Sequence, residues 1–233
     1  MKRALAIVAA AAVPLALAPL AATPAGAAQP RIYHTISSTH GSAAIDVTQG
    51  CERSEVYASS SRAMYAAQPG PVGKQGLTGV YVRITDVCAP SRALAVAPAA
   101  GGGGGTVLFE ADAQNWAPLV VDPRLTRASV TTDLPGTDGD GDPVIVHLVA
   151  TWTGTGSLEH STVSTHTHFG DGNVNATDNN LRRVATASVS VRVAGRSVTG
   201  QDTAAVLEQT KSRCIEVPRP GAVDFYPCFG FPG

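Results

Sequence analysis

The clearest capacity for chemistry in this chain lies in four of its six histidines, which fall close together. His166 and His168 are two residues apart, His160 precedes them, Asp171 follows three residues later, and His147 lies further upstream. Side chains two apart on a strand point to the same face, and imidazole and carboxylate groups are ligands of zinc and copper. The spacing predicts that a transition-metal site here would use His166 and His168 as first ligands. Asp171 or His160 would be the third ligand, and His147 the fourth.

The same pattern also fits an exposed strand face with ordinary imidazoles, so the elements around the histidines decide between the two interpretations. Two strands joined at residues 154–156 are predicted, because side chains alternate in character on both sides of this glycine-containing turn. If Thr155 and Gly156 form a two-residue turn, His147 lies on the face of the other three histidines. A loop one residue longer moves those three to the face of Trp152 and leaves His147 outside.

A second set of possible ligands is the acidic run Asp138-Gly-Asp140-Gly-Asp142. Carboxylates at alternate positions resemble the first half of a calcium loop. The helix–loop–helix calcium motif requires Gly at the sixth position and Glu at the twelfth, where this chain has Pro143 and Val149. The run therefore predicts either a weak calcium site or a solvated turn.

The first residues predict a secretory signal peptide, residues 1–28. A basic start, Met1-Lys2-Arg3, precedes an apolar run to about Leu20, and small residues follow before a cut after Ala27 or Ala28. An uncleaved membrane anchor is the alternative, which the prolines and the alanine-rich composition of the run disfavour. We expect a secreted, extracellular protein with no membrane span in the mature chain.

Charge argues against some classes of partner. Without Lys2 and Arg3 the chain keeps 15 basic and 18 acidic residues, a net charge of −3. Since there is no basic stripe, nucleic acid is not an expected partner.

Four cysteines in an exported chain are expected to be paired. Among the three possible connectivities, Cys51–Cys88 and Cys214–Cys228 are favoured because each pair is local. Each closed loop would add roughly 3–4 kcal/mol by the chain-entropy model.

Alternating apolar residues separated by turn residues predict an all-β fold, an antiparallel β-sandwich or barrel-like domain. The apolar face of residues 144–152 is predicted to face the core, and the last long strand to run from about residue 184 to 193. One short C-terminal helix is predicted at residues 202–211, which begin with Asp. The expected organisation is an N-terminal β region (29–100), a glycine-rich loop or linker (101–105), a β domain (106–213) and a disulfide-pinned tail (214–233).

Residues 152–158, Trp-Thr-Gly-Thr-Gly-Ser-Leu, with histidines shortly after, resemble a group of uncharacterised secreted β-rich proteins of high-GC bacteria. The resemblance covers roughly residues 125–211. It implies an exported β domain and no activity, because no activity is known for the group.

Two classes of function follow from these patterns. The chain has no Gly-x-Ser-x-Gly elbow for a nucleophilic serine, which favours a non-catalytic secreted domain that binds a cell-envelope or extracellular protein or glycan. Tyr33, Tyr57, Tyr81 and the aromatic tail are possible contacts for such a partner. The alternative is a metal-binding protein or metal-dependent enzyme that uses the histidines and Asp171, with zinc or copper as the bound ion. Calcium is considered only for Asp138, Asp140 and Asp142, and the non-catalytic domain is expected to need no cofactor.

Overall fold

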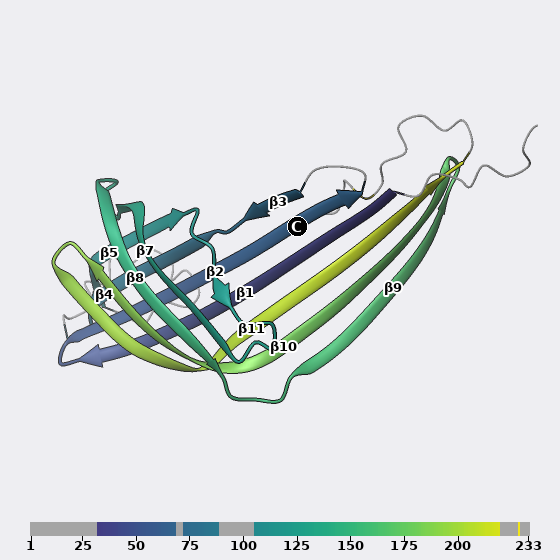
Figure 1. Ribbon diagram of the computed structural model, residues 1–233. Coiled ribbons are helices and arrows are strands. Elements are labelled where there is room, and N and C mark those ends of the chain that lie inside the picture. The colour runs from purple at the N-terminus through teal and green to yellow at the C-terminus, as the bar shows by residue number, and fades with distance from the viewer. Residues whose placement is uncertain (1–31, 69–71, 89–104, 220–227, 229–233) are drawn as a thin grey trace, which may run out of the picture.

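The computed structural model describes residues 32–68, 72–88, 105–219 and 228, and in this part the chain is all antiparallel β-sheet with no α-helix (Figure 1). The predicted signal peptide, glycines 101–104 and most of the predicted tail lie outside the described residues. The strands are β1 (Ile32–Gln49), β2 (Glu52–Gln68), β3 (Val72–Gln75), β4 (Thr78–Asp86), β5 (Thr106–Asn115), β6 (Val120–Val121), β7 (Arg127–Asp138), β8 (Pro143–Gly154), β9 (Glu159–Phe169), β10 (Gly172–Val193) and β11 (Arg196–Pro218).

The eleven strands of the described residues belong to one sheet, whose main path has the order β1-β11-β10-β8-β7-β5-β4-β2-β3. β1 also pairs with β2, so the first eight strands of this order form a closed circuit. β9 pairs with β10, β6 with β7, and β3 with β2, outside the circuit. Closing the circuit joins strands from both ends of the described chain.

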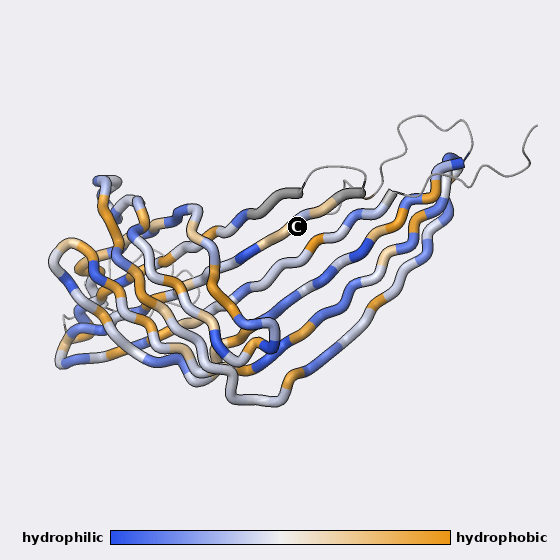
Figure 2. Tube along the Cα trace, in the orientation of Figure 1, coloured by the Kyte–Doolittle hydropathy of each residue, from blue (hydrophilic) through white to orange (hydrophobic). Residues whose placement is uncertain are grey.

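The long strands extend well beyond the circuit. In Figure 1, β4, β5, β7 and β8 gather at one end, while β3, β2, β1, β11, β10 and β9 continue side by side as a curved, open sheet. We call this open sheet the extension. Hydrophobic residues concentrate on the strands of the closed end, and the extension is mostly polar (Figure 2).

The core fills the closed end and is built around the predicted apolar face of β8. Trp152, Leu148 and Val146 on that face are fully buried, which confirms the prediction from period-two alternation. The indole of Trp152 donates a 3.0 Å hydrogen bond to the carbonyl oxygen of Ser42. Gly41 lies directly against the same indole, where a Cβ would come within 3.3 Å of the ring.

The helix predicted at residues 202–211 is wrong, because this segment lies inside β11. Leu207 and Ala205 are buried in the core and pair with residues of β10. Asp202 accepts hydrogen bonds from the backbone N–H groups of Ala44 and Ala204, both at 2.8 Å, and lies at a register shift of the β10–β11 pair. Pairing with β1 and β10 therefore overrides the weak local preference for a helix.

Both predicted disulfides are confirmed. Cys51 is bonded to Cys88 across 37 positions and Cys214 to Cys228 across 14. The described residues include no helix long and apolar enough to cross a membrane.

Candidate metal site on strand β9

Strand β10 positions most of the residues that the sequence singled out. Its 22 residues pair with β9 over their first half, from Gly172 to Arg182, and with β8 over their second half, from Ala185 to Arg192. β8 and β9 therefore follow one another along β10 instead of forming the predicted hairpin. The prediction of a hairpin is therefore wrong, and neither of the two turn registers considered for it applies.

His166 and His168 lie opposite two asparagines of β10. His166 pairs with Asn175 and His168 with Asn173, on the face that lines the core further along β10. The Nδ1 atom of His168 is 2.8 Å from Oδ1 of Asn173, and Nδ1 of His166 is hydrogen-bonded to Oδ1 of Asn175. Each ring is thus held by an amide on the neighbouring strand.

The two imidazoles converge on one point. Their Nε2 atoms are 3.1 Å apart, and the rings are nearly perpendicular, with an interplanar angle of 83° and centroids 4.4 Å apart. Two nitrogens bound to one zinc ion at 2.0–2.1 Å lie about 2.9 Å apart at a right angle and about 3.3 Å apart at the tetrahedral angle. The observed separation lies between these values. We call His166 and His168 the histidine clamp.

The asparagines occupy the outer nitrogen of each clamp ring. Each amide oxygen accepts a hydrogen bond from the Nδ1 atom beside it, so Nε2 is the nitrogen of each ring that faces the other ring. Two lone pairs that face each other repel unless a cation or a shared proton lies between them. The clamp is therefore arranged to take up a positive charge, and its amide partners have the role of outer-shell groups in metal sites.

The other predicted ligands do not join the clamp. His160 lies on the same strand face, and its Nε2 is 3.5 Å from the hydroxyl of Thr162. The backbone carbonyl of Asp171 accepts a 2.8 Å hydrogen bond from Arg219, at the turn between β9 and β10. Among the described residues, no third His, Cys, Asp or Glu ligand atom forms a cluster with those of His166 and His168.

His147 lies far from the clamp. It pairs with Arg192 of β10, whereas His166 pairs with Asn175, and that interval is roughly 55 Å along the strand at about 3.3 Å per residue. Its Nδ1 is 2.7 Å from a carboxylate oxygen of Asp133 on β7. His147 therefore belongs to a separate surface pair.

The acidic run keeps its carboxylates apart. Oδ1 of Asp138 accepts hydrogen bonds from the backbone N–H groups of Asp140, at 3.1 Å, and Asp142, at 2.9 Å. This pattern closes the turn between β7 and β8. Within the described residues the three carboxylates do not cluster as cation ligands.

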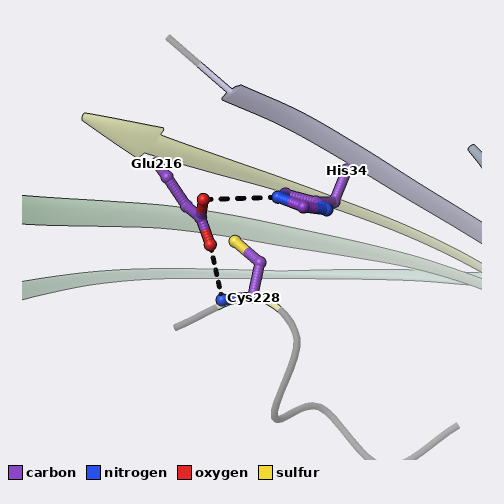
Figure 3. Close-up of side chains that lie close together, drawn as sticks. All are labelled: His34, Glu216 and Cys228. Atoms are coloured by element: carbon purple, nitrogen blue, oxygen red, sulfur yellow. Dashed lines mark hydrogen bonds and ion pairs between the residues drawn. The ribbon is translucent and has the colours of Figure 1, made fainter. Parts of the chain in front are cut away.

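A second group, which no sequence pattern indicated, contains His34, Glu216 and Cys228 (Figure 3). It lies on the opposite face of the extension, because His34 is in register with Cys214 and Ala176, one position out of phase with Asn175. His34 on β1 and Glu216 on β11 are 2% and 0% exposed, with Nε2 of His34 3.3 Å from Oε2 of Glu216. The other carboxylate oxygen accepts a 2.8 Å hydrogen bond from the backbone N–H of Cys228, and Nδ1 of His34 is 2.9 Å from the hydroxyl of Tyr65. Burial, followed by the negative charge of Glu216, raises the pKa of Tyr65.

No local pattern marks this buried group, because its members come from both ends of the described chain. The one available signal was Glu216 two residues after Cys214, which places both side chains on the same strand face. Beside the group, a cavity of about 320 Å³ reaches the Cys214–Cys228 disulfide and is lined in part by Asp178 and Asn180.

Comparison with known proteins gives no family, because no protein-family model, curated protein or solved structure matches this chain.

Proposed function

We propose that this is a secreted, non-catalytic β protein that binds one divalent transition-metal ion through the histidine clamp. The observation that carries the proposal is the 3.1 Å separation of the two Nε2 atoms, while the Nδ1 atom of each ring is engaged by an asparagine. Two intramolecular disulfides are compatible with an oxidising compartment and support the extracellular assignment.

The two imidazole ligands determine the expected metal affinity and the expected preference among metal ions. Two imidazoles leave at least two coordination positions to water, so the site suits capture of an ion better than structural stabilisation. We expect a Kd near or below 10 μM, which corresponds to about 7 kcal/mol. Imidazole sites follow the general order of divalent metals, so copper(II) should bind more tightly than zinc.

The experiment is a calorimetric titration of untagged protein with zinc and copper(II). The wild type should bind one ion per chain, and the His166→Ala, His168→Ala double variant should bind none while keeping its β-sheet circular dichroism. The matched control is the His147→Ala, His160→Ala double variant, which removes two histidines outside the clamp and should bind like the wild type. Equal binding by the two double variants would overturn the proposal.

A second candidate function is binding of an extracellular glycan in the cavity beside the Cys214–Cys228 disulfide. Its support is a lining of hydroxyl, amide and carboxylate side chains from three adjacent strands, the groups that bind sugar hydroxyls. These residues are Ser38, Asp178, Asn180, Thr210 and Ser212. A glycan that binds the wild type should lose affinity for the Asp178→Ala variant, and should bind the His166→Ala variant unchanged.

A further inference from the structure

The buried group on the opposite face of the extension contains an unusual set of side chains for a structural contact. His34 and Glu216 lie beneath Cys228, and Cys214 is also buried, at 7% exposure. His34 pairs directly with Cys214 across the β1–β11 ladder, so both point to the same face. An imidazole, a carboxylate and the sulfur of Cys228 therefore meet at one buried place, and the sulfur of Cys214 is bonded to that of Cys228.

A buried ion pair is a poor way to hold a tail on a sheet. Desolvating a carboxylate and an imidazole costs several kcal/mol per charged group, and apolar side chains of the same size pack at least as stably. The disulfide already attaches Cys228 to β11 covalently. The His34–Glu216 pair therefore calls for a role besides anchoring.

Side chains of these three residue types form tetrahedral zinc sites. Zinc is bound by Cys, His and carboxylate ligands in closed four-coordinate sites, with neighbouring ligand atoms about 3.3–3.8 Å apart. The ligand atoms of His34, Glu216 and Cys228 already lie within 4.8 Å of one another. Tyr65, at 2.9 Å from Nδ1 of His34, is placed to hold the outer nitrogen while Nε2 faces inward.

We propose that the Cys214–Cys228 disulfide is the oxidised form of a zinc site whose ligands are Cys214, Cys228, His34 and Glu216. A trialkylphosphine and water reduce the disulfide to two thiols, and the phosphine becomes its oxide. Zinc then displaces one proton from each thiol, and His34 binds through Nε2 with its proton on Nδ1. In the disulfide form both sulfurs are bonded to each other and the site takes no zinc.

This site is distinct from the histidine clamp, which lies on the opposite face and does not depend on redox state. The test therefore uses the full chain with His166→Ala and His168→Ala, so that zinc at the clamp does not contribute. Cobalt(II) replaces zinc in a parallel titration, because thiolate-to-cobalt charge transfer reports sulfur ligands directly. Oxidised and phosphine-reduced samples are compared.

The second disulfide needs its own control, because Cys51, Cys88 and Asp86 also lie together and reduction frees their thiols. Two changes separate the sites. Glu216→Gln removes the carboxylate charge of the buried group, and Asp86→Asn makes the matched change beside Cys88.

The reduced protein should bind zinc with a thiolate–cobalt absorption, and the oxidised protein should bind none. Glu216→Gln should weaken binding at least tenfold, whereas Asp86→Asn should leave one site intact. A Cys51→Ala, Cys88→Ala variant should also keep one site. Absence of zinc binding by the reduced chain, including a reduced chain that has unfolded, or a loss caused by Asp86→Asn instead of Glu216→Gln, would overturn the proposal.

Discussion

Replacement of Asn173 by alanine is predicted to weaken metal binding by the histidine clamp about tenfold without destabilising the fold. Oδ1 of Asn173 lies 2.8 Å from Nδ1 of His168, and this bond keeps the proton on Nδ1 and directs Nε2 toward His166. Loss of such an outer-shell hydrogen bond lowers metal affinity by about 10–100-fold. Both rings are exposed, so water can replace the missing acceptor. The loss of metal affinity should therefore be near tenfold, which corresponds to about 1.4 kcal/mol of binding free energy.

The assay is competition for zinc between the protein and a chromophoric chelator, at fixed pH because protons compete for the same nitrogens. Asn179→Ala is the matched control. Asn179 lies on the same face of β10, and its amide oxygen accepts a 3.0 Å hydrogen bond from Thr162 instead of from the clamp. An Asn173→Ala affinity equal to that of the wild type, or an equal loss in Asn179→Ala, would refute the role given to the amides.

Three further predictions concern stability. Glu216→Ala should lower the free energy of unfolding by about 3–5 kcal/mol in a urea titration, because it leaves His34 buried without its carboxylate, whereas the exposed Glu208→Ala should change it by under about 0.5 kcal/mol. Burial alone would raise the pKa of Asp122, but the hydrogen bonds from the turn that it closes hold this pKa below its usual value. Asp122→Ala should therefore lower the free energy of unfolding by about 1 kcal/mol at neutral pH. The difference in this free energy between the variant and the wild type should shrink as the pH falls below about 4. Gly136→Ala should reduce the thermal midpoint sharply, because the new Cβ would meet backbone and Cβ atoms of β5 within 2.6 Å, while Gly79→Ala meets nothing closer than 3.7 Å and should fold normally.

Local patterns predicted the features that local geometry controls. The buried face of β8 followed from alternation, because one side chain in two must point to the core. The closeness of His166 and His168 followed from their two-residue spacing on a strand. The disulfide pairing followed from proximity in sequence, and it is confirmed.

Features that depend on long-range pairing were not predictable. His147 was placed near the clamp because β8 and β9 were expected to pair, but both pair with β10, whose length no local pattern revealed. The segment at residues 202–211 satisfied a local helix pattern, yet β1 and β10 on either side require an extended strand. The contact of His34 with Glu216 depends on pairing between the first and last strands, which the sequence does not specify.

The proposed function requires that the two Nε2 atoms of the clamp bind one metal ion. Nitrogen-15 NMR of the imidazole side chains measures it directly, because the two ring nitrogens of each histidine give separate signals that depend on protonation and metal binding. In the free protein, His166 and His168 should both carry the proton on Nδ1. One equivalent of zinc should shift both Nε2 signals together and leave the signals of His147 and His160 unchanged. A shift of only one ring, a shift at Nδ1, or an equal response from His160 would contradict the account.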